Sequence, residues 1–262
     1  MRLRFSAILK LMNIKEGSKV SKITKESIIN YHNNAFKKYK KNTLISLNAL
    51  LKSFLEFCET ERFLDKTPYF KITMKNAKEG EKIDPFSLNE IKAILQSIPD
   101  LRLKAFLTTA FFTGTGEQLA LLWSDIDFEN KKINIDKSLN LSGAITSPKN
   151  KSSIREVDLL EQKILKELKA TEPANKKMIF LSVPKRTQDF QRAFKKLLKA
   201  LNLKDRKLYA TRHTFASLSQ GEEAMWVSQT LGHKDLNTTY KTYSHYIPQQ
   251  EKERAAFLKG ML

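Results

Sequence analysis

The chain has 262 residues and carries 47 Lys and Arg against 28 Asp and Glu, a formal net charge of +19 at pH 7. Hydrophobic residues make up 41% of the chain, which excludes a disordered polyelectrolyte. A single cysteine, Cys58, excludes an internal disulfide and any metal site built from several cysteines, and it fits a reducing cytoplasm.

The positive charge is spread along the chain rather than confined to a tail. Residues 1–80 hold 17 basic and 7 acidic residues, and residues 81–262 hold 30 and 21. Because so large a charge repels itself in a folded protein, it points to a polyanionic partner, nucleic acid first. An acidic membrane surface and a merely solubilising surface are the alternatives. No apolar stretch reaches the roughly 18 residues of a membrane span, so we expect a cytoplasmic protein with no membrane partner.

Residues 1–80 predict a helical domain. We expect Thr43 to cap a helix whose apolar residues recur every three or four positions. A shorter helix around Ile28 precedes it, and the basic run 37–41 lies between the two. That run alone fits a solvated turn and a phosphate contact equally well, and the positive charge of the domain around it favours the contact. The polar stretch 73–85 predicts a linker, so we divide the chain into domains of residues 1–80 and 81–262.

The second domain combines helices with short strands. It opens at a capping box formed by Ser87 and Glu90, and the apolar segment 101–112 predicts a buried helix. Segments 132–136 and 154–159 alternate with period two and predict antiparallel strands. The predicted fold class is therefore mainly α with a small antiparallel β-sheet.

Histidine, arginine and tyrosine gather near the C-terminus. His213, His233 and His245 lie there with Arg212, and four tyrosines share the stretch: Tyr209, Tyr240, Tyr243 and Tyr246. One interpretation is a helical core with hydrogen-bonded histidines and packed rings. A metal site is disfavoured, since the histidine spacing exceeds helical spacing and no carboxylate or cysteine completes a ligand set. The cluster points instead to phosphate chemistry without a metal or cofactor.

Four motifs in order resemble the tyrosine recombinase (phage integrase) family. Residues 209–217, Tyr-Ala-Thr-Arg-His-Thr-Phe-Ala-Ser, resemble its second arginine box, and Leu-Gly-His ending at His233 and then Tyr243 follow at family spacing. Upstream, residues 123–127 resemble the segment after the first arginine box, and residues 147–155 the hairpin that presents a lysine. The resemblance covers about residues 85–250. It implies an N-terminal helical core-binding domain followed by an α+β tyrosine-recombinase catalytic domain.

The resemblance implies a role for each matching residue. Arg212 and His233 would hold the scissile phosphate, and Tyr243 would attack it to form a 3′-phosphotyrosine. Lys149 would protonate the leaving 5′-oxygen. Tyr209 stands where the family most often has histidine, and a phenol can still donate to phosphate. The implied partners are double-stranded DNA and three further copies of the chain, a homo-tetramer on paired sites.

Three of these assignments have rivals in the sequence. Tyr240 and Tyr246 compete with Tyr243 for the role of nucleophile and could simply pack. Lys151 competes with Lys149 as the lysine of the hairpin. His213, directly after the arginine, is expected to be structural.

The first arginine box departs from the family pattern T-G-x-R-x-x-E. The chain reads Thr113-Gly114-Thr115-Gly116-Glu117, so two residues are absent between Gly114 and Glu117, the arginine among them. We expect a helix to start there nonetheless, because residues 115–118 can form a capping box.

Three functions therefore compete. The first is a site-specific recombinase or integrase that cleaves and rejoins DNA for a mobile element. The second is a relative that binds DNA but is catalytically impaired by the missing arginine. The third is an architectural DNA-binding protein whose tyrosines and histidines belong to its core.

Overall fold

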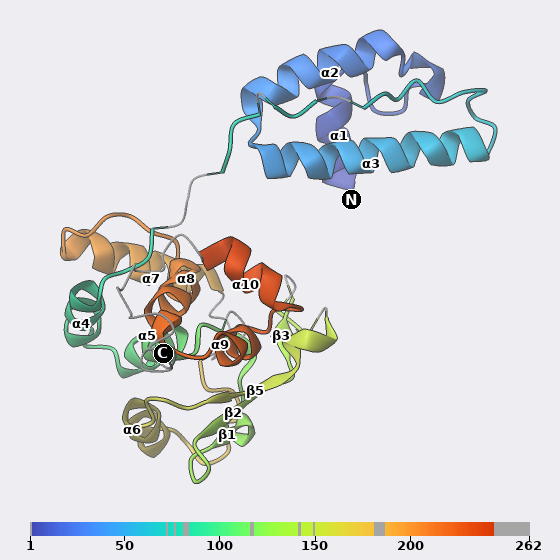
Figure 1. The fold of residues 1–262 in the computed structure, drawn as a ribbon. Coiled ribbons are helices and arrows are strands. Elements are labelled where there is room, and N and C mark those ends of the chain that lie inside the picture. The colour runs from blue at the N-terminus through green and yellow to red at the C-terminus, as the bar shows by residue number, and fades with distance from the viewer. Residues whose placement is uncertain are drawn as a thin grey trace, which may run out of the picture. The chain divides into compact units, whose positions relative to one another are not determined.

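A computed structural model describes residues 2–71, 73–75, 77–80, 84–115, 118–140, 143–148, 150–180 and 187–243 (Figure 1). The chain divides into two compact units, Met1–Lys82 and Ile83–Leu262, named unit 1 and unit 2 below. Among the described residues, no helix combines the length and the apolar character that crossing a membrane requires.

Unit 1 contains the helices α1 (Arg2–Leu11), α2 (Lys25–Lys38) and α3 (Lys41–Thr60). The predicted cap of α3 is wrong: the helix starts two residues before Thr43, with Lys40 at the N-cap and no side-chain cap. The Lys40 carbonyl already accepts from the Thr43 amide, and the Lys41 amide donates to the carbonyl of Lys78 at 2.8 Å. A backbone contact from far along the sequence therefore replaces the side-chain cap.

The apolar face predicted for α3 forms the core of unit 1. Four of its residues are buried in one cluster with residues of α1 and α2: Leu44, Leu47, Leu51 and Leu55. Cys58 is buried as well. Tyr31 of α2 is also fully buried, and its hydroxyl donates to Oδ1 of Asn48 at 2.8 Å. Such a bond removes most of the cost of burying two polar groups.

His32, beside Tyr31, lacks such compensation. It is 3% exposed among aromatic rings, and neither ring nitrogen has a hydrogen-bond partner among the described residues. Burial lowers the pKa of His32 from 6.5 to about 4. Between these two values the unfolded chain binds more protons at His32 than the folded one. His32 therefore does not reduce the free energy of unfolding of unit 1 above pH 6.5, and it lowers this free energy as the pH drops towards 4.

We expect His32→Leu to remove this pH dependence. A shift of this size corresponds to a loss on the order of 3 kcal/mol in the wild type between pH 6.5 and 4. Leucine has a similar volume and no proton to bind. Hydrogen exchange of the α3 amides at both pH values measures the effect in unit 1 alone. An equal loss of stability in the variant would assign the pH dependence to other groups.

Unit 2 surrounds the central helix α5 (Leu101–Thr113). The other helices of this unit are α4 (Leu88–Gln96), α6 (Lys163–Thr171), α7 (Thr187–Ala200), α8 (Ala210–Leu218), α9 (Ala224–Leu231) and α10 (Leu236–Tyr243). The predicted capping box is confirmed at α4, where the Ser87 amide donates to Oε2 of Glu90 at 2.8 Å and the Glu90 amide to Oγ of Ser87 at 3.2 Å. The mainly α fold with small antiparallel sheets is confirmed as well.

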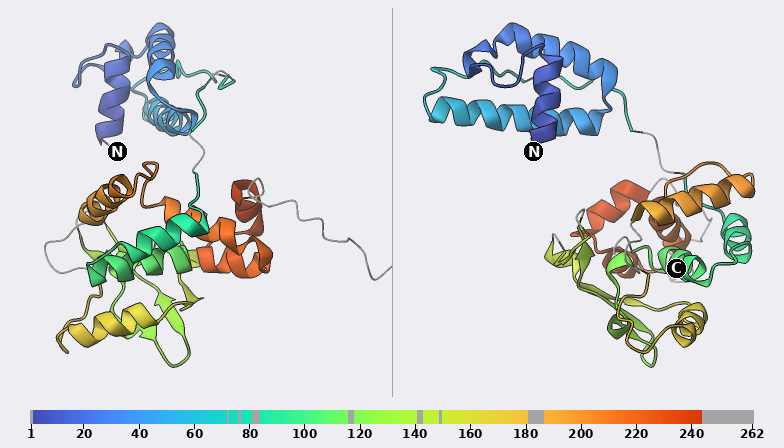
Figure 2. Two further views of the ribbon diagram at one scale, coloured as in Figure 1. Left: turned by 90° about the vertical axis from the view of Figure 1, so that its left-hand side faces the viewer. Right: turned by 180° about the vertical axis from the view of Figure 1, so that it is seen from behind.

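Two small sheets accompany these helices. Strands β1 (Ile126–Asp127), β2 (Lys132–Ile135) and β5 (Arg155–Asp158) form an antiparallel sheet in that order, and α6 lies beside it (Figure 2). Ile133 pairs with Val157 in its register. Strands β3 (Ser138–Leu139) and β4 (Ile145–Thr146) form a separate two-stranded ribbon. Both predicted strands are confirmed, and the ribbon lies within the polar stretch between them.

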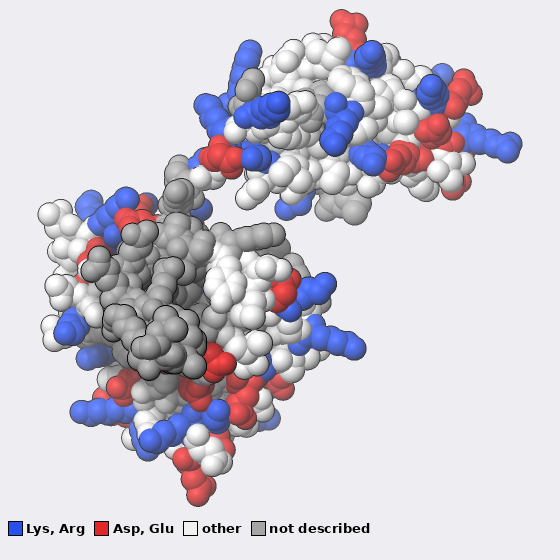
Figure 3. Space-filling model, in the orientation of Figure 1, with Lys and Arg blue, Asp and Glu red and all other residues white. Residues whose placement is uncertain are grey.

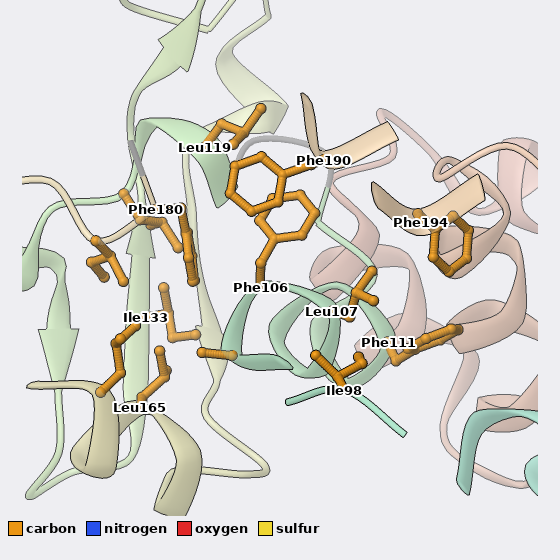
Figure 4. Close-up of a cluster of buried hydrophobic side chains, with 14 of the residues drawn as sticks. Ile98, Phe106, Leu107, Phe111, Leu119, Ile133, Leu165, Phe180, Phe190 and Phe194 are labelled. Carbon is orange, nitrogen blue, oxygen red and sulfur yellow. The ribbon is translucent and has the colours of Figure 1, made fainter. Parts of the chain in front are cut away.

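The core of unit 2 is rich in phenylalanine. Phe106 of α5 stacks on Phe190 of α7 with ring centroids 4.1 Å apart, and its ring meets that of Phe180 edge to face (Figure 4). The sheet contributes Ile133 and α6 contributes Leu165 to the same cluster. One continuous apolar cluster thus ties the sheet to α5, α6 and α7, and this holds the elements around α5 in place.

The helix expected after the first arginine box is absent from the described residues. Residues Gln118–Ala120 form only a 3-10 turn. The backbone is then extended, since the carbonyl of Leu121 accepts from Ile179 at 3.1 Å and the amide of Trp123 donates to Lys177 at 2.9 Å. This pairing uses backbone groups that a longer helix would need. Gly116 and Glu117 themselves lie outside the described residues.

Candidate active site

Arg212 lies in the first turn of α8 and joins two other helices. Its Nη1 donates to the carbonyl of Gly114 at 3.0 Å and its Nη2 to the carbonyl of Leu231 at 2.5 Å. Gly114 ends α5 and Leu231 is the last residue of α9. The C-terminal end of a helix carries partial negative charge, so both ends attract the guanidinium. Arg212 is thereby held at the point where α5, α8 and α9 meet.

Gly114 is packed too tightly for any side chain. Its φ is +59°, and a Cβ there would lie 2.7 Å from Cδ1 of Phe215 and 2.9 Å from Cδ2 of Leu231. Glycine is therefore required by both conformation and space. The two residues absent from the first arginine box would follow Gly114. Because Arg212 of the second arginine box binds the Gly114 carbonyl, this gap lies directly beside Arg212.

His233 follows the left-handed Gly232 that ends α9. Burial and the nearby Arg212 and Arg155 lower the pKa of His233 to about 4, so the imidazole is neutral at physiological pH. Its Nδ1 lies 2.7 Å from Oγ1 of Thr239 on α10. When that hydroxyl donates to Nδ1, the ring proton stays on Nε2, the form that can donate to a phosphate oxygen.

Tyr209 and His213 flank Arg212 on α8. The side chain of Tyr209 is 55% exposed, and its ring meets that of His213 edge to face at 5.2 Å. His213 is buried, and burial together with Arg212 lowers its pKa. An exposed phenol beside the arginine is available to a ligand, whereas the buried imidazole packs beneath it.

The model of the phage integrase family matches residues 84–250. A tyrosine recombinase XerC-like protein of Caldanaerobacter subterraneus subsp. tengcongensis is 32% identical, over 94% of this chain and 73% of the relative. The chain belongs to the phage integrase family. The ICEBs1 integrase of Bacillus subtilis is 29% identical over the same shares of the two chains.

A solved structure shares the fold of this chain. The Tn1549 transposon integrase, in complex with transposon right end DNA, has a TM-score of 0.76 and 18% identity, and the match covers 92% of this chain and 88% of that chain. The order of helices and small sheets described above is therefore the phage integrase fold.

The side chains of two predicted site residues of this family member are not described by the structure. Lys149 falls in a gap between β4 and the turn Lys151–Ser153. Tyr243 is the last residue of α10, and only its backbone is described. His245 and Tyr246 also fall beyond the described residues. The structure places Arg212 near His233, and the catalytic roles of all the predicted site residues stay predictions.

Sequence reasoning missed three partners within this site. Two are the backbone carbonyls of Gly114 and Leu231, whose contacts no pattern of side chains in the sequence predicts. The third is Thr239, whose position four residues before Tyr243 places it on the same face of α10. Thr239 is buried, with 7% of its surface exposed.

Proposed function

We propose that this chain is a site-specific DNA recombinase that acts in the cytoplasm, cleaving and rejoining duplex DNA in the integration or excision of a mobile element. The observation that supports it best is the placement of Arg212 close to His233. Arg212 donates to the carbonyl of Leu231, two residues before His233, and Nδ1 of His233 contacts Thr239 of α10, the helix that ends at Tyr243. The relatives described above as a recombinase and integrases support the same reaction class.

In the proposed reaction the Tyr243 phenol loses its proton to solvent and its oxygen bonds to phosphorus, while the bond from phosphorus to the 5′-oxygen breaks. Lys149 gives a proton to that 5′-oxygen, which is otherwise a poor leaving group. Negative charge grows on the non-bridging oxygens, and the planar fork of Arg212 and the His233 N–H are suited to stabilise it. The phosphotyrosine preserves the bond energy, so the same steps in reverse rejoin the strand without a cofactor.

An adduct assay tests this proposal. Labelled duplexes that span the two junctions of the element carrying the gene are incubated with the full chain and separated under denaturing conditions. A covalent protein–DNA band supports the recombinase. Specific binding to an inverted repeat without any band favours the impaired relative, which the gap beside Arg212 makes the second candidate. Binding without sequence preference would indicate an architectural protein.

We further propose that four copies assemble on two paired sites. Each duplex would carry two copies, so that four tyrosines are available for the exchange of four strands. Sedimentation of the chain with one site and with two joined sites measures the stoichiometry. A complex that stays at one copy per duplex would contradict this assembly.

Binding to duplex DNA should weaken steeply with salt. Lys and Arg side chains are exposed on both units (Figure 3), and each phosphate contact releases counterions when it forms. We expect the logarithm of the binding constant to fall with the logarithm of salt concentration with a slope of about −5 or steeper. Fluorescence anisotropy in a potassium chloride series gives the slope, and a nearly flat line would exclude contacts to several phosphates.

Lys37 separates the two interpretations of the basic run at residues 37–41. It is exposed near the end of α2. If it contacts a phosphate, Lys37→Gln should reduce the magnitude of the salt slope by about one. An unchanged slope identifies this run as a solvated turn.

A further inference from the structure

The strand β5 and the helix α9 are joined by hydrogen bonds at both ends of the strand. Nε of Arg155, the first residue of β5, donates to the carbonyl of Thr230 at 2.8 Å. Oδ2 of Asp158, the last residue, accepts from Nε1 of Trp226 at 2.8 Å. Thr230 and Trp226 are four residues apart and share one face of α9. The helix therefore has a defined position along the strand, and Lys132 of β2 holds Asp158 in turn at 2.9 Å.

Arg155 makes two more contacts that bear on the site. A Cβ at Gly232 would lie 2.9 Å from its Nη1 and 3.0 Å from its Cζ, so the guanidinium lies directly against this glycine. Nη1 also donates to the carbonyl of Ser153 at 2.9 Å. Ser153 closes the turn Lys151–Ser153. One guanidinium thus touches the residue before His233 and the turn that follows the predicted lysine.

We propose that Arg155 is a positioning residue of the active site, which fixes the turn carrying His233 relative to the turn Lys151–Ser153 that follows Lys149 in the sequence. This inference rests on the proposed function for the roles of His233 and Lys149. Arginine is suited to the task because its planar fork reaches two carbonyls at once, whereas the single ammonium of lysine is a point charge.

The charge of Arg155 adds a second effect at His233. Arg155 and Arg212 lower the pKa of His233 after burial, His213 acts in the same direction, and Asp235 opposes them. The side chain that holds the turn therefore also helps to keep the imidazole neutral. In that state, with its proton on Nε2, His233 donates a hydrogen bond as an uncharged group.

Two substitutions in the full chain, without DNA, test the role. The amides of Gly232 and His233 donate to the carbonyls of Gln229 and Ser228, so their hydrogen exchange reports the turn. We expect Arg155→Gln to lower their protection about tenfold or more, as loss of a charged hydrogen bond allows, and to raise the pKa of His233. Arg155→Lys should lower the protection while leaving the pKa near its wild-type value, because the charge is retained.

Arg192→Gln is the matched control, since it makes the same change on a side chain of α7 that is 71% exposed, and it should alter neither reading. Unchanged protection in both Arg155 variants would overturn the proposal. So would an equal fall at the core amides of Phe106 and Leu107, which would mean a loss of overall stability. The hydrogen-exchange experiment contains no DNA and is independent of the adduct assay. A failure to form the adduct in that assay would contradict the proposed function but would not change the result for Arg155.

Discussion

Tyr243→Phe is expected to abolish the covalent protein–DNA adduct while leaving DNA affinity and folding unchanged. The substitution removes a single oxygen, the proposed nucleophile, and keeps the ring. Tyr243 is the last residue of α10. Trapping on labelled duplex followed by denaturing electrophoresis measures the adduct, and anisotropy on the same duplex measures the affinity.

Tyr240→Phe and Tyr246→Phe provide the controls. Tyr240 is 49% exposed on α10 and three residues before Tyr243, which makes it a neighbour on the same side of the helix and a real competitor. Both controls should retain the adduct at close to the wild-type rate. If the adduct persists in Tyr243→Phe and disappears in a control, the spacing assigned from Gly232-His233 is wrong by one helical turn.

Local sequence signals predicted the elements of unit 2 well because they act within one element. The capping box at Ser87 and the alternation in 132–136 each depend on neighbours a few residues away. The two errors have a common cause. At Lys41 a carbonyl from Lys78 replaced the expected cap, and at Leu121 pairing with Ile179 replaced the expected helix. Backbone bonds between distant segments leave no periodic pattern in the sequence.

In the candidate site, too, local motifs could be predicted from the sequence and contacts between distant segments could not. Arg212 and His233 could be predicted from the order and spacing of motifs. Their surroundings could not, since Arg212 is held by carbonyls that every residue type carries. Gly114 offered only an indirect signal, because its need for a left-handed conformation and its contact with Phe215 appear once α5 and α8 are packed together.

The absence of the first arginine is expected to slow cleavage, and the contacts of Arg212 add to this effect. Two of its N–H groups are bound to the carbonyls of Gly114 and Leu231, so part of its donor capacity serves the fold. If Arg212 is the single arginine at the phosphate, as proposed, we expect the charge of the transition state to be under-compensated. Losing one preorganised donor typically costs about 10²–10³ in rate, roughly 3–4 kcal/mol. We therefore expect the chain to bind DNA normally and to cleave it slowly.

Inserting Met-Arg between Gly114 and Thr115 restores the family spacing and should raise adduct formation by at least about tenfold, a low bound for one charged donor. The new arginine would follow Gly114 by two positions, and the Gly114 carbonyl is the group that Arg212 binds. Inserting Met-Gln has the same length without the charge and should give no gain. Arg102 cannot take the place of the missing arginine. It lies at the N-terminal end of α5, opposite Gly114, and pairs there with Glu172. Full activity of the unmodified chain, with no gain from Met-Arg, would show that another basic side chain already fills the place.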